Sequence, residues 1–260
     1  TIIAKRIEQK LREITFSKHP KLMKRNNLCI GRNTILEEFE QRIDNFDQKQ
    51  PKCIIATGLE SIGRRTFLNF ALQKTDIINQ TYSINTIYLN TDDSVEDFIL
   101  KINDLGFLDI NYELRDLLSK KIEDKINIAL KLIREMQEHN ELILILDNGC
   151  IVNFEKKISY WFKKIIDSNI LENKITICTA SKYKVDFKEI YNDNFFSIHV
   201  DDLNTSERKR LFKRLLGIYE IDISNDDFNY FSKIFYGLPE QIIYTVDYIN
   251  RTNIGYVKDN

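Results

Sequence analysis

The stretch IIATGLESIGRRTFLNFALQK, residues 54–74, decides the fold class of this chain. An apolar, β-branched run over residues 52–57 ends before Gly58, and a helical pattern of apolar residues covers 64–75. A buried strand, a tight turn and a helix are therefore expected in direct succession. Four further apolar runs follow, each separated from the next by a longer polar or helical stretch. They cover residues 84–90, 141–147, 174–179 and 195–200.

Buried strands that alternate with helices predict an α/β fold with a parallel sheet covered on both faces. We expect five strands, with the run 141–147 at the centre of the sheet and next to the run 52–57. After residue 203 the strand runs stop, and three helical patterns predict a small helical subdomain. The remaining helices are expected over residues 2–16, 33–46, 94–104, 124–140 and 154–168. The predicted organisation is a basic helical lead (1–32), an α/β domain (33–203) and a helical subdomain (204–260).

The amino-acid composition limits the classes of partner and the cellular location that can be expected for the protein. The net charge is -1, although residues 1–32 hold nine Lys or Arg and two Glu. A net charge near zero is not typical of nucleic-acid-binding proteins, so nucleic acid is not expected as a partner. The four cysteines show no metal-ligand spacing, and no apolar run has the length of a membrane span. We therefore expect a reduced, cytoplasmic protein without a membrane partner.

The two glycines of the opening stretch match a phosphate-binding loop. Such a loop has Gly, four residues, Gly, Lys and then Ser or Thr, between a strand and a helix. The glycines let successive backbone N–H groups turn toward an anion, and the following helix adds the positive end of its dipole. A diphosphate is the ligand that this arrangement fits. The candidate cofactor-binding residues are Gly58, Ser61, Ile62, Gly63, Arg64, Arg65 and Thr66.

Two positions depart from the loop pattern. Arg64 stands where Lys would reach the outer phosphates, and a guanidinium can also bind phosphate. Arg65 stands where a Ser or Thr hydroxyl would hold Mg²⁺, and arginine has no acceptor atom. The sequence thus argues against a bound Mg²⁺. We expect Arg65 to replace the metal by pairing with Asp147 or with phosphate; the alternative is that Arg65 points to solvent.

Asp147 and Asn148 follow directly on the apolar run LILIL and form a Walker B segment. In such a segment the aspartate holds a metal-bound water, which makes Asp147 the candidate catalytic residue and the metal ligand if Mg²⁺ binds. Asn148 occupies the place where many ATPases carry a second carboxylate that positions the attacking water. Because an amide is a poor base, we expect a slow ATPase at most.

The order of these motifs resembles the STAND class of P-loop NTPases, the AAA+-related group that includes NACHT and NB-ARC modules. Residues 203–212 match its Leu-x-x-x-Glu-x-x-x-Leu-Phe stretch, while the usual Arg at the end of the sensor strand is missing. The resemblance implies further cofactor-binding residues in the adenine pocket and on the sensor strand. These are Ile30, Gly31, Arg32 and Pro239 for the adenine side, and Thr179 for the sensor strand.

The resemblance also implies a function. A STAND module binds ADP or ATP between its α/β domain and helical subdomain, self-associates into oligomers, and couples sensor and effector domains of a longer chain. Bacterial versions serve innate immunity, antiviral defence or cell-death signalling, with effectors such as TIR domains. Two alternatives stay open. Arg64, Arg65 and Asn148 favour a nucleotide-free pseudo-NTPase scaffold, and the basic stretches 1–32 and 206–214 support a DNA-associated ATPase of the origin-recognition type.

Overall fold

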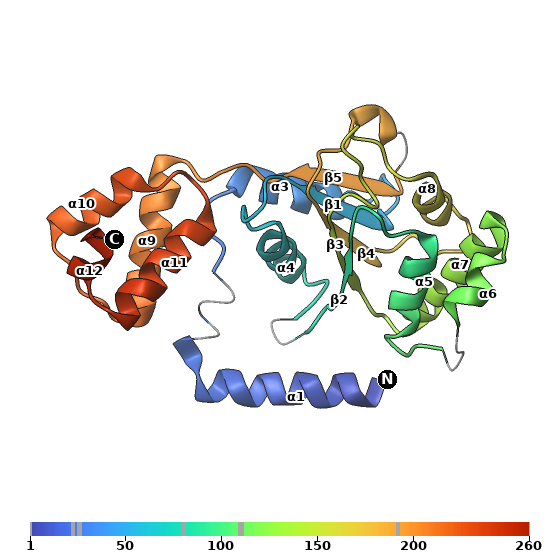
Figure 1. The fold of residues 1–260 in the computed structure, drawn as a ribbon, viewed down its shortest axis with the longest axis horizontal. Coiled ribbons are helices and arrows are strands. Elements are labelled where there is room, and N and C mark those ends of the chain that lie inside the picture. Colours follow the sequence, from blue (N-terminus) through green and yellow to red (C-terminus); the bar gives the residue numbers. More distant parts are fainter. Residues whose placement is uncertain are drawn as a thin grey trace.

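The computed structural model describes residues 2–21, 24, 28–79, 82–108, 112–190 and 193–259, with side chains from Ile7 onward. Its centre is a five-stranded sheet in which all neighbouring strands are parallel (Figure 1). The fold class expected from the sequence, a parallel five-stranded α/β core followed by a helical subdomain, is confirmed. The strands are β1 (Cys53–Thr57), β2 (Asn85–Leu89), β3 (Ile143–Asp147), β4 (Ile177–Ser181) and β5 (Phe195–His199).

The lateral order of the strands differs from the expected one. The order is β2-β3-β4-β1-β5, so β4 is central and separates β3 from β1. Every residue of β1 and β4 is buried, as interior strands require. The placement of 141–147 at the centre, beside 52–57, was wrong. Motif order along a chain indicates which strand ends share an edge of a parallel sheet, but not how many strands lie between them.

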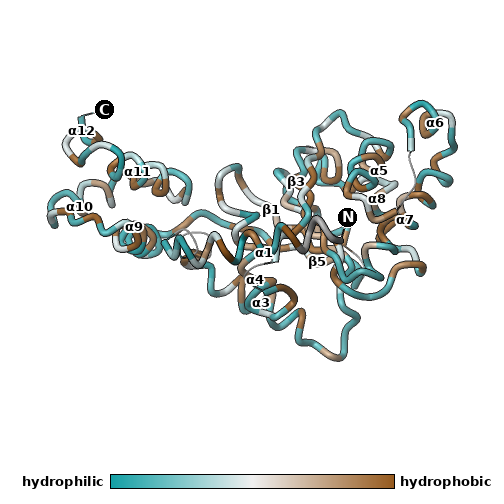
Figure 2. The backbone as a smooth tube through the Cα atoms, turned by 90° about the horizontal axis from the view of Figure 1, so that it is seen from below, coloured by the Kyte–Doolittle hydropathy of each residue, from teal (hydrophilic) through white to brown (hydrophobic). Residues whose placement is uncertain are grey.

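Helices cover both faces of the sheet. On one face lie α3 (Asn33–Ile43) and α4 (Arg64–Lys74), whose apolar residues form one core cluster with the strands. The opposite face packs a second cluster against α5, α7 and α8. Figure 2 shows the hydrophobic residues concentrated along the strands and on the inner sides of these helices. The helices of the second face are α5 (Val95–Asn103), α6 (Leu114–Leu118), α7 (Ile122–Glu138) and α8 (Tyr160–Ile166).

Strand register brings one residue of each strand into a single row at the carboxyl edge of the sheet. Thr57 pairs with both Ser181 and His199, Ser181 pairs with Asp147, and Asp147 pairs with Leu89. In open α/β sheets, ligands bind outside this edge. The row therefore marks where a functional site would be built.

The chain after the sheet, residues 205–259, forms a helical group with its own apolar core, well separated from the sheet in Figure 1. Phe212 stacks on Phe228 and meets Phe235 edge-on at the centre of this core. We keep the division of the chain near residue 203 as a proposal. The helices are α9 (Thr205–Tyr219), α10 (Asn225–Ile234), α11 (Pro239–Arg251) and α12 (Ile254–Asp259).

Several element ends differ from those expected. The helix expected over 154–168 begins only at Tyr160, because Val152 and Ile158 form a β-bridge that closes the preceding loop. Helices α6 and α12 were not expected. The first helix, α1 (Ile2–Lys18), carries an apolar face as predicted, but Ile7, Leu11 and Ile14 remain exposed on it.

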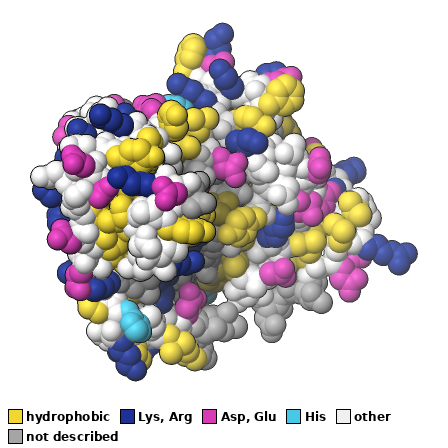
Figure 3. All heavy atoms as spheres, turned by 60° about the vertical axis from the view of Figure 1, so that its left-hand side comes forward, with side chains coloured by type: hydrophobic (Ala, Val, Ile, Leu, Met, Phe, Trp, Pro, Cys, Tyr) yellow, Lys and Arg dark blue, Asp and Glu magenta, His cyan; other side chains and the backbone are white. Residues whose placement is uncertain are grey.

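The surface of the helical side mixes basic, acidic and hydrophobic side chains (Figure 3). Across the described part of the chain, no helix combines the length and apolar composition needed to cross a membrane.

Candidate functional site

The loop between β1 and α4 has the backbone geometry of an anion-binding turn. Ser61 and Gly63 adopt left-handed conformations with φ of 62° and 89°. Gly58 is required for space, since a Cβ there would lie 2.5 Å from the carbonyl oxygen of Val200. Helix α4 begins at Arg64, and no side chain caps its first turn. Its first backbone N–H groups are therefore available to an anion.

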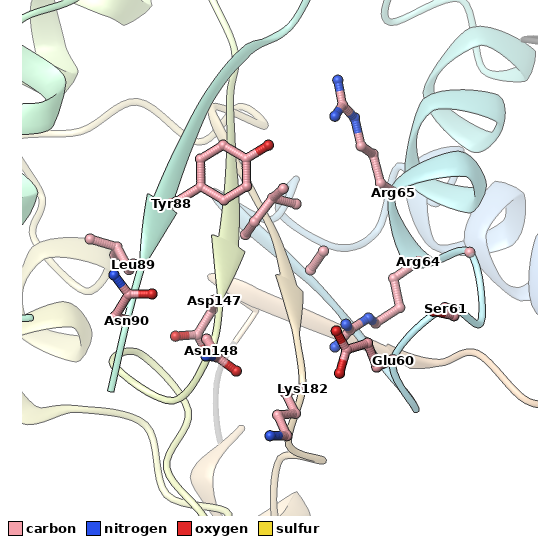
Figure 4. Close-up of a pocket in the computed structure, with 13 residues that line it drawn as sticks. Glu60, Ser61, Arg64, Arg65, Tyr88, Leu89, Asn90, Asp147, Asn148 and Lys182 are labelled. Carbon is pink, nitrogen blue, oxygen red and sulfur yellow. The ribbon is translucent and has the colours of Figure 1, made fainter. Parts of the chain in front are cut away.

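A cavity of about 390 Å³ opens beside this loop at the carboxyl edge of the sheet. This volume lies within the range of about 300–1,000 Å³ typical of small-molecule sites. Figure 4 shows side chains reaching it from the loop, from the ends of β2 and β3, and from the end of β4. The structure thus brings Gly63 and Asp147 to one cavity, as the sequence predicted. Charged and polar lining residues are Glu60, Ser61, Arg64, Arg65, Tyr88, Asn90, Asp147, Asn148 and Lys182.

The carboxylate of Asp147 accepts four hydrogen bonds from neighbouring protein groups. Its Oδ1 accepts from the backbone N–H groups of Gly149 (3.2 Å) and Ile151 (2.8 Å). Its Oδ2 accepts from the backbone N–H of Val152 (3.0 Å) and from the Ser181 hydroxyl (2.8 Å). Only 3% of Asp147 is exposed. The carboxylate therefore organises the loop that follows β3.

Asn148, the neighbour of Asp147, is exposed and lines the cavity. Its backbone anchors the edge of the site, because its N–H donates to the Leu89 carbonyl at 2.8 Å and its carbonyl accepts from the Thr91 hydroxyl at 2.8 Å. The side-chain amide is left at the cavity surface. It offers a polar contact there but no carboxylate to activate water.

Arg64 extends its guanidinium into the cavity beside Glu60 (Figure 4). Its Nη1 is buried and has no hydrogen-bond partner among the described residues. Burial lowers the pKa of Arg64, while the negative charges of Glu60 and Asp147 oppose this shift. A buried guanidinium nitrogen without an acceptor is costly, so this side chain is arranged to meet an anion.

Arg65 does not make the pairing with Asp147 that the sequence suggested. Its side chain is exposed and points away from Asp147 in Figure 4. The helical geometry explains this outcome, because one residue advances the side chain by about 100° around the axis. Arg64 faces the strand ends, and Arg65 therefore turns outward. Thr66 is exposed as well and borders a second, smaller cavity.

Ile62 and Thr179, two of the expected cofactor-binding residues, have buried side chains. Ile62 is 1% exposed and belongs to the core, so only its backbone can reach a ligand. Thr179 is fully buried in mid-strand, where its hydroxyl lies 4.0 Å from the Cys53 sulfur. β4 continues for two more residues, about 7 Å, and ends at Ser181. The expected role of Thr179 was wrong, because the strand end was placed too early.

The segment of Ile30, Gly31 and Arg32 lies against both the loop and the helical subdomain. The Arg32 backbone N–H donates to Oε1 of Glu207 at 3.0 Å, and its guanidinium donates to the Ile62 carbonyl. Gly31 has φ of 75°, and a Cβ there would lie 2.3 Å from Glu207 Oε1. Burial lowers the pKa of Arg32, and the interactions with Cys29 and with the Glu207 carboxylate oppose this shift. Arg32 therefore joins α3, the loop and α9.

Pro239 approaches the loop from the other end of the chain. It is the first residue of α11, and its ring lies 4.0 Å from the position that a Cβ on Gly63 would take. With Ile30, Arg32 and Thr66 it borders a cavity of only about 50 Å³ between the loop and the helical subdomain. This volume is far below that of a ligand site, so a nucleobase would enter only after this space widens.

Ser181 and Lys182 were not predicted as site residues, and Glu207 was noted only as part of the stretch 203–212 that matches the family motif. Lys182 follows the end of β4 and lines the main cavity, Ser181 binds Asp147, and Glu207 joins α9 to Arg32. Polar residues at a strand's carboxyl end were the available signal for the first two. For Glu207 the signal was Asn204, three residues earlier, with which it forms a capping box.

Comparison with known proteins identifies the fold. A scan against protein-family profiles finds no match, and a search of curated proteins finds no similar sequence. Among solved structures, a Walker-type ATPase of Pyrococcus abyssi matches with a TM-score of 0.53 and 10% identity over 89% of this chain and 71% of that one. The replication initiator DnaA, solved bound to AMPPCP and single-stranded DNA, matches with a TM-score of 0.54 and 13% identity over 90% of this chain and 66% of that one.

A STAND protein with a tetratricopeptide-repeat sensor from Pyrococcus horikoshii is also similar, with a TM-score of 0.50 and 12% identity. The match covers 83% of this chain but 29% of that protein. At these identities the likeness concerns the fold. The chain has the fold of the P-loop NTPases.

Proposed function

We propose that this chain is a nucleotide-binding module that takes ADP or ATP at the loop of residues 58–66. One observation carries the proposal: segments from both ends of the chain meet at that loop. Arg32 donates to the Ile62 carbonyl, and Pro239 packs beside Gly63. An ordinary strand–turn–helix junction has no need of such a convergence, whereas a site for a phosphate chain and a base does.

In this proposal the phosphates of the nucleotide occupy the cavity of about 390 Å³ and the base occupies the cavity of about 50 Å³. The diphosphate lies on the backbone N–H groups that lead from Ser61 into α4, with Arg64 beside it. The base lies toward Ile30 and Pro239, where the space of about 50 Å³ must open. That space is bordered by Leu211 and Leu215 of α9 and by Leu203, which precedes that helix. Nucleotide occupancy would thus change how the subdomain sits on the core, which is the property of a switch.

Hydrolysis is weak or absent in this proposal. Asn148 takes the place of a second acid, and Arg65 offers no oxygen to a metal. Missing electrostatic stabilisation and an unpositioned water each cost orders of magnitude in rate. The module would hold its nucleotide rather than turn it over.

The STAND resemblance supports a wider role as a proposal. In it, this chain is the oligomerisation and switch module of a larger cytoplasmic signalling protein, which also carries sensor and effector domains. Bacterial immune, antiviral or cell-death signalling with an effector such as TIR is the context that we propose. Nucleotide-dependent self-association of the module is the feature of this role that can be measured on the chain itself.

Nucleotide content tests the proposal against a nucleotide-free scaffold. The purified 260-residue chain is denatured, and released nucleotides are separated by chromatography. We expect ADP or ATP at a substantial fraction of one equivalent, or its uptake when the protein is incubated with it. A chain that neither carries nor takes up nucleotide would be a scaffold. Gly63→Val serves as the matched variant, since Gly63 has φ of 89° and a β-branched residue would strain the loop there.

A specific observation also favours the DNA-associated alternative. The structure brings the two basic stretches of the sequence together around one cavity of about 900 Å³, between the segment before α3 and helix α9. Among the described residues that line it, Glu220 is the only acidic one, and it pairs with Lys21 at 3.0 Å. The basic residues that line it are Lys21, Lys24, Arg210, Lys213 and Arg214. Such a groove suits a phosphodiester backbone.

Salt dependence tests this second candidate. Labelled single-stranded and duplex DNA are titrated with the chain at 50 and 200 mM salt. Contacts with several phosphates predict an affinity that falls steeply between the two conditions, and a smaller slope for the double variant Arg210→Glu, Lys213→Glu. Absence of binding at 50 mM salt would remove nucleic acid from the list of partners.

A further inference from the structure

We infer that the site binds nucleotide phosphate without Mg²⁺, using Arg64 and Lys182 as its cations, and that Asp147 is a structural residue. The inference rests on the proposed nucleotide binding. It concerns which groups neutralise the negative charge of the phosphates. P-loop enzymes use Mg²⁺ for this purpose. Three observations on the described residues carry it.

The first observation concerns the residue that would hold the metal from the loop. In P-loop NTPases a Ser or Thr hydroxyl on the first turn of the helix and an aspartate at a strand end hold Mg²⁺ between them and the phosphates. Here the hydroxyl position is Arg65, which has only donors. Its side chain points away from Asp147 and toward solvent (Figure 4). Position 65, where the hydroxyl would bind the metal, therefore supplies no side-chain oxygen.

The second observation concerns the aspartate. A carboxylate has about four acceptor positions. All four are used by Gly149, Ile151, Val152 and the Ser181 hydroxyl, at 2.8–3.2 Å. Turning the carboxylate toward a hydrated metal would leave these buried donors without partners. The residues present therefore do not fit Mg²⁺, and Asp147 instead closes the loop that follows β3.

The third observation concerns the positive charge that is present. Arg64 enters the cavity with a buried, unpartnered Nη1, and Lys182 enters it from the end of β4. The Lys182 backbone is fixed beside Asp147, because its N–H donates to the Asp147 carbonyl at 3.1 Å. Its ammonium lies over the Tyr183 ring, 5.7 Å from the ring centre. The two cations reach the cavity from different elements, Arg64 from the start of α4 and Lys182 from the end of β4 (Figure 4).

The experiment is calorimetric titration of the whole chain with ADP, once with 5 mM MgCl₂ and once with excess EDTA, using ATP as a second probe. We expect the two dissociation constants to agree within about threefold, since no metal contributes a large share of the binding energy. A loss of affinity greater than about tenfold in EDTA would overturn the inference and leave the proposed function standing. No binding in either buffer would overturn the proposed function and the inference with it.

Single substitutions test whether Arg64 and Lys182 are the cations that contact the phosphates. Lys182→Ala and Arg64→Ala should each weaken ADP binding in EDTA by about tenfold or more, as expected for a lost charge-assisted contact. Lys184→Ala is the matched control, because Lys184 is an exposed lysine two residues away that lines a different cavity. Equal affinities of Lys182→Ala and Lys184→Ala would show that Lys182 does not meet the phosphates and would overturn its assignment.

Discussion

The hydroxyl of Ser181 donates a 2.8 Å hydrogen bond to Oδ2 of Asp147, across two neighbouring strands at the carboxyl edge of the sheet. Both residues are buried, and three backbone N–H groups complete the shell around the carboxylate. A residue that the sequence presents as a metal ligand is thereby tied into the scaffold. This relationship leads to the first prediction.

Asp147→Asn should destabilise the chain in the absence of any ligand. An amide has a single acceptor oxygen, so its NH₂ group would face donors that the carboxylate now satisfies. We expect a loss in the free energy of unfolding on the order of 2–3 kcal/mol, measured by chemical denaturation. Asn148→Asp, at the exposed neighbour, should change it by less than about 0.5 kcal/mol. An unchanged stability of Asp147→Asn would mean that the carboxylate is free for another role.

Glu60→Gln should tighten ADP binding. The Glu60 carboxylate lies beside Arg64 in Figure 4 and would repel a bound phosphate. Removing one charge about 6 Å away in a water-like dielectric is worth about 0.7 kcal/mol, roughly a threefold gain in affinity. The same change at Glu38, exposed on α3, serves as the control in the titration. Weaker binding by Glu60→Gln would instead indicate that Glu60 helps to hold the ligand.

Gly31→Ala should weaken the connection between the loop and the helical subdomain. The residue has φ of 75°, and a Cβ would lie 2.3 Å from Glu207 Oε1, so the contact between Glu207 and Arg32 must shift. The left-handed conformation alone costs roughly 1–2 kcal/mol for alanine. Gly217→Ala, inside α9 with nothing within 4 Å of the added Cβ, should be neutral or stabilising in the same thermal melt. Equal melting temperatures would contradict this account of Gly31.

Cys29 should report nucleotide binding chemically. It is the only one of the four cysteines that is not buried, and it borders the small cavity with Pro239. Burial raises the pKa of the Cys53 thiol well above its usual value and those of Cys150 and Cys178 to about 12. Alkylation should therefore begin at Cys29. Because the thiolate is the reactive form, and partial burial also raises the pKa of Cys29, labelling should speed up as the pH rises above neutral.

Saturating ADP should slow alkylation of Cys29 in proportion to the occupied fraction, as followed by mass spectrometry of the labelled peptide. Labelling of the unfolded chain provides the control, since ADP should not affect it. Unchanged labelling of the folded chain at saturating ADP would place the base away from this cavity.

Much of the fold could be predicted because apolar runs and helical patterns carry it. The run 52–57 became β1 over Cys53–Thr57, and the two glycines became the expected turn. The lateral strand order could not be predicted, because it depends on crossover connections that leave no mark on β3 or β4 individually. The end of β4 was placed two residues too early, at the buried Thr179, whereas the strand ends at Ser181.

Those features of the candidate site that follow from the course of the backbone could be predicted from the sequence. Features that depend on the direction of a single side chain could not. The convergence of Asp147 with Gly63 on one cavity follows from strand ends that share an edge. The expected pairing of Arg65 with Asp147 was not found, because the Arg65 side chain is exposed and points away from Asp147 (Figure 4). The position of a residue in the loop pattern does not by itself determine the direction of its side chain.

The central claim is that a nucleotide binds at the loop of residues 58–66, between the α/β core and the helical subdomain. A crystal structure of the chain grown with ADP tests it most directly. We predict the diphosphate on the backbone N–H groups from Ser61 to Thr66, in contact with Arg64, and the base beside Ile30 and Pro239 in a widened cavity. A loop without ADP at saturating concentration, or ADP bound elsewhere, would contradict the account.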